Sequence, residues 1–192
     1  MINLIIEIIA VISAILYLLL AAKEDVKCWY AAIISSLLYF FIMYDAGLIM
    51  EAYLQVFYII MALYGLFQWK NLIQINSTNR IRTWSNVQHF ITISSVIILA
   101  ILTGFILTKY TNAALPFLDA FTSWGAIITT YMVAKKILEN WIYWFVIDAI
   151  SIYLFLSRGL YLTSILFLMY LIIICFGYIA WRKKFLESSV QY

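Results

Sequence analysis

Long apolar segments alternate with short polar ones along the whole chain, and this pattern predicts an all-α membrane protein. An apolar stretch of about 20 residues is long enough to cross a bilayer as a helix. The predicted helices cover residues 3–22, 29–44, 50–69, 87–108, 115–134, 138–157 and 160–181. The sequence therefore predicts seven transmembrane helices, with tight turns around Gly47 and Gly159 and a polar loop over residues 71–88.

The composition favours lipid over water as the surrounding medium. Hydrophobic residues make up 67% of the chain and charged residues 11%, whereas a soluble domain has about 45–50% apolar and about 25% charged residues. The first apolar segment lacks the basic start of a secretory signal peptide, because Glu7 is its first charged residue. We therefore expect residues 3–22 to stay in the protein as its first span.

Basic residues gather on one side of the predicted membrane topology. Seven spans place the two termini on opposite sides. One side then holds Lys23, Lys27, Lys70, Arg80, Arg82, Lys135, Lys136, Arg182, Lys183 and Lys184, and the other holds only Lys109 and Arg158. Because Lys and Arg are enriched in cytoplasmic loops, we expect the N-terminus outside and the C-terminus in the cytoplasm.

Residues recur along the chain at a fixed offset of 112 positions (159 − 47). The matched pairs are Gly47 and Gly159, Trp29 and Trp141, Tyr58 and Tyr170, Gly65 and Gly177, and Trp69 and Trp181. We expect Gly65 and Gly177 to allow close helix approach. Trp69 and Trp181 are predicted to mark the cytoplasmic interface of the membrane.

The repeat predicts a 3+1+3 architecture. Three helices reverse the direction of the chain, so a fourth helix must intervene for the second copy to run parallel to the first. The predicted parts are a first three-helix repeat (1–70), a cytoplasmic loop with linker helix (71–112), a second three-helix repeat (113–184) and a cytoplasmic tail (185–192). Transporters place a substrate site between such halves, although a duplication can also serve only to build a stable bundle.

Asp148 lies near the middle of its predicted helix, too deep for its short side chain to reach the interface. A charged Asp at that depth costs roughly 2.5–3.5 kcal/mol, so a cavity, a hydrogen-bond network or a cationic ligand must offset it. At about 100° per residue, Asn140, Trp144 and Ser151 share its stripe, with Trp141 at the edge. We predict that this stripe binds a ligand; the alternative is a structural Asp bonded to Ser or Tyr of a neighbouring helix.

Two other predicted helices add polar and aromatic residues to the candidate site. The full set of predicted substrate-binding residues is Ser36, Tyr39, Gln55, Tyr58, Asn140, Trp141, Trp144 and Asp148. Aromatic rings beside a carboxylate suit a small, flat, cationic molecule, because each ring face attracts positive charge by about 2 kcal/mol when water is excluded. Glu7 and Asp119 lie near the outer ends of their helices, where we expect hydrated carboxylates.

Other kinds of chemistry find little support in the sequence. His89 is the single histidine, and Cys28 and Cys175 are far apart, so neither a metal centre nor a redox pair is predicted. No phosphate-binding loop or nucleophile–base pair accompanies Asp148, which argues against an enzyme. We expect no cofactor and no nucleic-acid partner. A membrane enzyme and a scaffold protein are the alternatives to a transporter.

The chain resembles the PnuC-type vitamin transporters over nearly its whole length. The resemblance rests on Asn140-Trp141-Ile142-Tyr143-Trp144 followed by Asp148, on Arg158-Gly159-Leu160-Tyr161-Leu162-Thr163, on Gly177-Tyr178 with Trp181-Arg182, and on Tyr64-Gly65-Leu66-Phe67-Gln68-Trp69. One position departs from the family pattern: Leu66 stands where family members often have Trp, which bears on the choice of ligand.

This resemblance implies a SWEET-like fold and import of a vitamin precursor, with nicotinamide riboside first and thiamine or riboflavin as alternatives. It also implies facilitated diffusion across the bacterial inner membrane, with the substrate trapped in the cytoplasm by phosphorylation and used for NAD biosynthesis. We expect the two halves to rock around a site at their interface, as in other transporters built from repeats. Which vitamin is carried, and whether the chain forms an oligomer, stay open.

Overall fold

The computed structural model describes residues 2–45, 49–74, 81–110, 115–157 and 161–190. Within these residues the chain forms seven α-helices, so the predicted all-α fold and helix number are confirmed there. They are α1 (Ile2–Ala22), α2 (Cys28–Asp45), α3 (Ile49–Gln74), α4 (Asn86–Tyr110), α5 (Pro116–Ala134), α6 (Asn140–Ser157) and α7 (Tyr161–Val190). The turns predicted around Gly47 and Gly159 lie outside the described residues.

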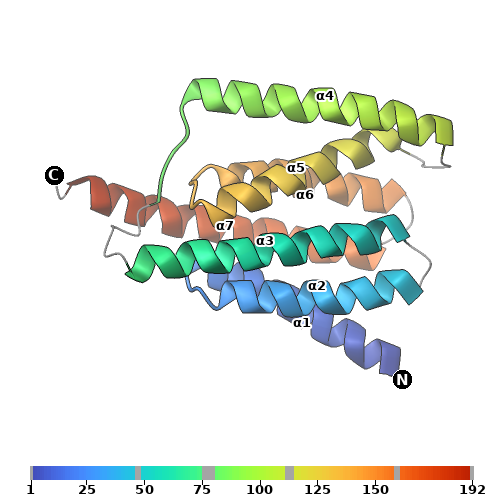
Figure 1. The fold of residues 1–192 in the computed structure, drawn as a ribbon, viewed down its shortest axis with the longest axis horizontal. Coiled ribbons are helices and arrows are strands. Elements are labelled where there is room, and N and C mark those ends of the chain that lie inside the picture. The colour runs from blue at the N-terminus through green and yellow to red at the C-terminus, as the bar shows by residue number, and fades with distance from the viewer. Residues whose placement is uncertain (1, 46–48, 75–80, 111–114, 158–160, 191–192) are drawn as a thin grey trace.

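The helices lie along one common direction and alternate in sense (Figure 1). The N-terminus and the C-terminus therefore lie at opposite ends of the bundle. The connections from α1 to α2, from α3 to α4 and from α5 to α6 share the end at which α7 finishes. We call it the basic end, because it carries Lys23, Lys27, Lys70, Arg82, Lys135, Lys136, Arg182, Lys183 and Lys184.

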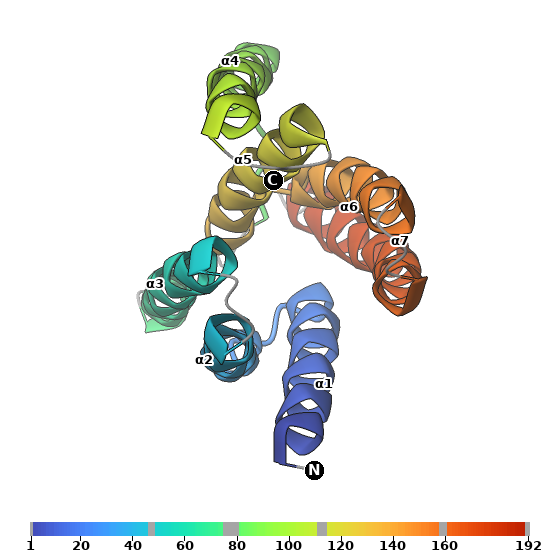
Figure 2. The same ribbon diagram turned by 90° about the vertical axis from the view of Figure 1, so that its right-hand side faces the viewer.

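Six helices form a closed ring, and α4 lies outside it. Among the described residues, contacts run from α1 through α2, α3, α5, α6 and α7, and from α7 back to α1. α4 packs against α5 on the outer side, as the view along the bundle shows (Figure 2). In this ring α1 lies opposite α5, α2 opposite α6, and α3 opposite α7. Opposite helices belong to different halves of the chain, so any contact between them crosses the centre of the ring.

The outer surface of the bundle is apolar. On α4 alone, Phe90, Ile98 and Phe105 are each more than half exposed, and a soluble monomer rarely exposes contiguous apolar surface of this kind. Three helices among the described residues are long and apolar enough to cross a membrane, at Ile5–Ala22, Asn86–Tyr110 and Ser164–Glu187. Shorter apolar helices cover Cys28–Ile42 and Asn140–Leu154. These features agree with a protein that lies in a bilayer.

Two helices extend further at the basic end than the sequence predicted. α3 continues to Gln74 and α7 to Val190, whereas both were predicted to end with their apolar stretch. α4 begins at Asn86, so the polar connection is shorter than the predicted loop, and the predicted polar tail is largely helical. The reason is that Lys, Glu and Gln favour helix, and Lys183 and Glu187 are spaced to support each other on one helix face.

Two glycines let indole rings pack directly against α3 and α7. A Cβ atom at Gly65 would lie 2.4 Å from the ring of Trp29 on α2, and one at Gly177 would lie 2.6 Å from the ring of Trp141 on α6. The close approach predicted for these glycines is therefore confirmed. It occurs between a helix and an indole ring, and the same contact is made in both halves of the chain.

Replacing Gly65 by alanine should destabilise the protein. A Gly→Ala change in a helix normally stabilises it by about 1 kcal/mol, but the new methyl group would overlap the Trp29 ring, and overpacking costs about 1–3 kcal/mol. Thermal unfolding of the purified protein in detergent measures the effect. Ala149→Leu, a larger change at an exposed position of α6, is the control. A G65A protein as stable as the parent would contradict this packing.

Candidate functional site

Four buried tryptophans form a cluster toward the basic end of the ring. The ring centroids of Trp29 and Trp69 are 5.4 Å apart and those of Trp141 and Trp181 are 5.5 Å apart, each pair edge to face at 86°. Trp69 and Trp181 lie 6.2 Å from each other. Because these two come from the opposite helices α3 and α7, their contact spans the centre of the ring.

The indole N–H groups of Trp69 and Trp181 bond to the other half of the chain. Trp69 Nε1 donates to the carbonyl oxygen of Ala134 at the end of α5 (3.1 Å), and Trp181 Nε1 donates to that of Ala21 near the end of α1 (3.0 Å). The last carbonyls of a helix have no partner within the helix and accept such bonds readily. The prediction that these tryptophans mark the membrane interface is wrong, since both are fully buried.

The first helix of each half ends in the same turn, with a residue other than glycine in the left-handed conformation. Glu24 has φ 57° after α1, and Lys136 has φ 55° after α5. In each turn the amide N–H of the next residue donates to the carbonyl five residues back, at 3.0 and 2.9 Å. Glycine is the usual residue at this position. A side chain there costs about 1–2 kcal/mol, so something else must favour Glu and Lys.

Glu24 and Lys136 form an ion pair. Lys136 Nζ lies 2.7 Å from Glu24 Oε2, and Lys184 Nζ lies 3.0 Å from Glu24 Oε1. The Lys136 side chain is 0% exposed, and its Nζ lies 4.4 Å from the centroid of the Trp69 ring. Burial lowers the pKa of the Lys136 ammonium below its ordinary value, and Glu24 opposes this effect. The ammonium therefore depends on Glu24, because a buried charge without a partner is very costly.

Sequence reasoning missed this pair, although a signal was present. Lys136 was counted only as one of the basic residues of the connecting loops. The two residues are 112 positions apart, which is the offset of the repeat. An acid and a base matched at that offset, Glu24 just after α1 and Lys136 just after α5, were the available signal for a contact across the ring.

The segment before α4 fastens the turn that carries Lys136. The Arg82 N–H donates to the carbonyl oxygen of Lys136 (2.9 Å), and the Leu138 N–H donates to that of Arg82 (2.8 Å). Nearby, His89 Nδ1 lies 2.9 Å from the Tyr143 hydroxyl on α6. No described segment pairs its backbone in this way with the matching turn after α1. The described segment before α4 thus gives the turn after α5 a backbone partner outside its own half.

Asp148 lies deeper in the ring, about 12 Å from Asn140 along the axis of α6. It is 4% exposed, and its carboxyl group is within electrostatic range of Tyr58 on α3 and Tyr170 on α7. No described residue forms a hydrogen bond or an ion pair with it. A buried carboxyl group without a partner is costly and marks a candidate ligand site.

The structure brings part of the predicted set of residues together. Tyr58 is near Asp148, and Tyr39 is within electrostatic range of Tyr170. No contact with Asp148 is described for Ser36, which is buried, or for Gln55 and Trp144, which are half-buried. Sequence reasoning did not include Tyr170 in the site, although its repeat match with Tyr58 was the available signal.

Three buried polar atoms near the tryptophan cluster lack a hydrogen-bond partner among the described residues. They are Trp29 Nε1, Trp141 Nε1 and Asn140 Oδ1. The Asn140 amide nitrogen donates to the carbonyl oxygen of Ile137 (2.6 Å), whereas its oxygen has no partner among the described residues. Each unpaired group costs about 1–3 kcal/mol, and a ligand could remove that cost. Trp29 was missed as a candidate, and its repeat match with Trp141 was the signal for it.

The chain matches a known family over most of its length. Residues 4–183 match the family described as nicotinamide mononucleotide transporter. The chain belongs to this transporter family. The nicotinamide riboside transporter PnuC of Escherichia coli (strain K12) is 23% identical over 188 residues, which cover 83% of this chain and 77% of that protein, and PnuC of Shigella flexneri gives the same values.

A solved structure supports the fold. The crystal structure of the vitamin B3 transporter PnuC matches with a TM-score of 0.73 and 22% sequence identity, over 93% of this chain and 81% of that one. The all-helical fold is thus one that a known transporter uses. Membership in the nicotinamide mononucleotide transporter family makes the chain a membrane transporter, and not an enzyme or a scaffold.

Two open apolar grooves of this transporter are lined neither by Asp148 nor by the tryptophan cluster. One runs between α4 and α5 beside Ile97 and Phe117, and the other between α6 and α7 beside Ile152 and Ile165. In the described part of the chain, no group of three His, Cys, Asp or Glu residues is placed to hold a metal ion. The ligand site predicted at Asp148 stays a prediction.

Trp69→Phe and Trp181→Phe should lower the stability of this transporter by similar amounts. Phenylalanine keeps an aromatic ring in place but leaves a buried carbonyl oxygen unpaired, which costs about 1–3 kcal/mol. Thermal unfolding in detergent measures the loss. Trp84→Phe is the matched control, because no described residue accepts a bond from its indole N–H. Equal stability of W69F and W84F would show that the bond between the two halves of the chain is unimportant.

Proposed function

We propose that this protein is a facilitator that imports nicotinamide riboside across the bacterial inner membrane. The observation that carries the proposal is Asp148, a carboxyl group buried inside the ring with Tyr58 and Tyr170 in electrostatic range and no bonding partner among the described residues. The relatives described above as nicotinamide riboside transporters support the choice of substrate.

Nicotinamide riboside carries a positive charge that can pair with the Asp148 carboxylate. Its pyridinium ring is flat and positively charged, so it can balance the carboxylate while it lies against phenol rings. Cation–π attraction is worth about 2 kcal/mol or more in a desolvated site. The attraction between the two charges is also stronger inside an apolar ring of helices than in water.

The unpaired atoms at the tryptophan cluster suit the remainder of the molecule. Two indole N–H groups and the Asn140 oxygen offer two donors and one acceptor, and a carboxamide and sugar hydroxyls offer both kinds of partner. These atoms lie toward the basic end from Asp148. We therefore place the two groups at successive positions on one path through the ring.

Transport would proceed by alternating access between two parallel three-helix repeats, α1–α3 and α5–α7, with α4 as the linker in a SWEET-like arrangement. Contacts that recur at the repeat offset support this division: Trp29 on Gly65 is matched by Trp141 on Gly177. In repeat-built transporters, rocking of one unit against the other exposes a central site to each side in turn. Phosphorylation in the cytoplasm would trap the imported molecule for NAD biosynthesis.

Thiamine is the second candidate substrate. It also carries a cationic aromatic ring, and Leu66 is the position that bears on the choice between the two. Leu66 stands where Trp is often found in the family, and it packs against the core that contains the tryptophans. Riboflavin lacks the positive charge and therefore fits Asp148 less well.

Asp148→Asn should weaken nicotinamide riboside binding by about 10- to 100-fold, as expected for the loss of a charged contact worth about 1.5–3 kcal/mol. Thermal stabilisation of the purified protein by the ligand measures this. At 100 times the dissociation constant, the ligand should add about 2.7 kcal/mol to the stability of the parent. Glu187→Gln makes the same chemical change at an exposed site on α7 and should bind like the parent.

The same assay with thiamine and riboflavin distinguishes the candidate substrates. Stabilisation by thiamine alone would reassign the substrate and keep the role of Asp148. If nicotinamide riboside stabilised the D148N protein as well as it does the parent, the role of Asp148 would be refuted.

We also propose that the basic end faces the cytoplasm and that the N-terminus lies outside. In a background without Cys28 and Cys175, Tyr110→Cys at the end of α4 should react in intact cells with a thiol reagent that cannot cross membranes. Glu187→Cys near the end of α7 should react only after permeabilisation. Both positions are exposed, so the comparison reports sidedness, and the reverse pattern would overturn the proposed orientation.

A further inference from the structure

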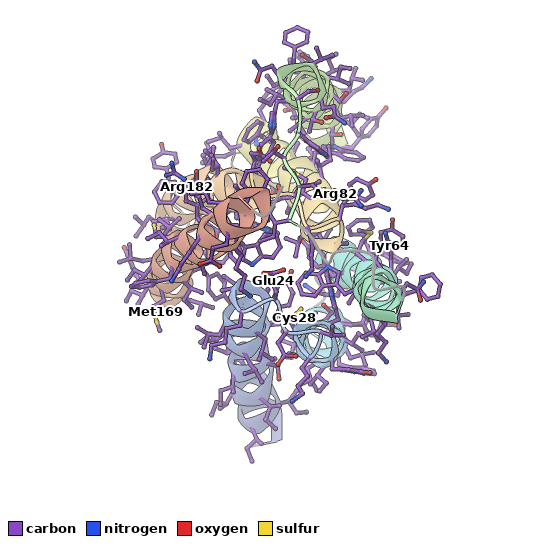
Figure 3. The ribbon with its side chains drawn as sticks, turned by 90° about the vertical axis from the view of Figure 1, so that its left-hand side faces the viewer. Glu24, Cys28, Tyr64, Arg82, Met169 and Arg182 are labelled. Atoms are coloured by element: carbon purple, nitrogen blue, oxygen red, sulfur yellow. The ribbon has the colours of Figure 1, made fainter. Side chains whose placement is uncertain are left out.

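The ion pair between Glu24 and Lys136 crosses the opening of the ring at its basic end. Glu24 follows α1 and Lys136 follows α5, and these two helices lie at opposite positions of the ring. Figure 3 looks onto this end and shows Glu24 near its centre, with Cys28 beside it. A molecule that moves along the axis of the ring has to pass this contact.

The tryptophans form a second contact across the same opening. Trp69 and Trp181 come from α3 and α7, which are also opposite, and their rings are 6.2 Å apart. Lys136 Nζ lies 4.4 Å from the centroid of the Trp69 ring, so the ion pair and the aromatic pair touch. Together the ion pair and the tryptophan pair connect α1 with α5 and α3 with α7 at the same end of the ring.

Stability alone does not account for this choice of residues. Glu24 and Lys136 both have the positive φ that favours glycine, and buried ion pairs can often be replaced by apolar residues without loss of stability. A charged pair differs from an apolar contact in one useful way. Once its members separate, water solvates each of them, so an open state is possible for the pair as well as a closed one.

We propose that Glu24 and Lys136 form a gate, and that the transported molecule leaves the ring at the basic end only after this pair separates. This inference rests on the transport function proposed above. Backbone bonds to Arg82 hold the turn of Lys136, so Glu24 and the end of α1 are the moving side. Lys184, which contacts the other oxygen of Glu24, must release it in the same step.

A fixed pivot is the competing role for these residues. A pivot would hold the two halves together while they rock, and its contacts would stay closed throughout the cycle. A gate has to open in every cycle. A covalent bridge between the two positions therefore separates the two roles.

The first test is the double variant Glu24→Cys/Lys136→Cys in a background with Cys28→Ala and Cys175→Ala. Bridging the two cysteines in membrane vesicles with a short bifunctional methanethiosulfonate, which forms a disulfide with each, should lower nicotinamide riboside uptake at least tenfold, and a reducing agent should restore it. Thermal stabilisation by the ligand should survive the bridge, because the binding residues are untouched. Unchanged uptake by fully bridged protein would show a pivot and overturn the gate.

The second test needs no substrate, and it decides the matter if the double variant does not transport. Cys28 is fully buried next to the pair and within electrostatic range of Lys136. In a Cys175→Ala background, Glu24→Gln should speed the reaction of Cys28 with N-ethylmaleimide at least tenfold. The charge-swapped Glu24→Lys/Lys136→Glu protein, with Lys184→Glu because Lys184 also contacts Glu24, should restore the slow rate.

Gly125→Ala is the matched control for general loosening of the bundle. Its new Cβ would lie 2.9 Å from Ile147, which disturbs the packing of α5 on α6 without touching the ion pair, and the Cys28 rate should stay slow. An E24Q protein that labels no faster than this control would overturn the gate. If the parent protein did not bind nicotinamide riboside but E24Q still exposed Cys28, only the substrate assignment would fail.

Discussion

The contact between Glu24 and Lys136 governs how the two halves of the chain meet. In water each charge would be solvated, but inside the ring each one depends on the other. The acid comes from the first half and the base from the second, and they lie on opposite helices. Neither half can therefore satisfy its own buried charge. The indole N–H groups of Trp69 and Trp181 connect the halves in the same way, because each one bonds to a carbonyl oxygen of the other half.

Asp148 is the complementary case. It is at least as deeply buried as Glu24, yet no described residue neutralises it. The ring thus holds one buried carboxylate that two lysines neutralise and one that the described side chains leave for a partner from outside. The first holds the molecule closed at one end, and the second is suited to attract a cation into it. This difference in how two acids are compensated is the physical basis of the transport proposal.

Several features of the fold could be predicted because they follow from local polarity or from the internal repeat of the sequence. Apolar runs located the seven helices, and the offset of 112 matched Trp29 with Trp141 and Gly65 with Gly177, which make the same contact in the structure. Helix ends were less predictable. The additional turns of α3 and α7 contain polar residues that favour helix, and an apolar pattern does not detect them.

The sequence by itself determined the helical class, the number of helices, the basic end and the depth of Asp148, because length and polarity set which segments suit a bilayer. Only the tertiary structure decided that α1 lies opposite α5, that Trp69 and Trp181 are buried at the centre, and that Lys136 is paired with Glu24 and shielded from water. These outcomes depend on which helices are neighbours in the ring. The order of the helices around the ring depends on how complete helix surfaces fit together, for example where the Trp29 ring packs on Gly65. No local pattern in the sequence encodes that fit.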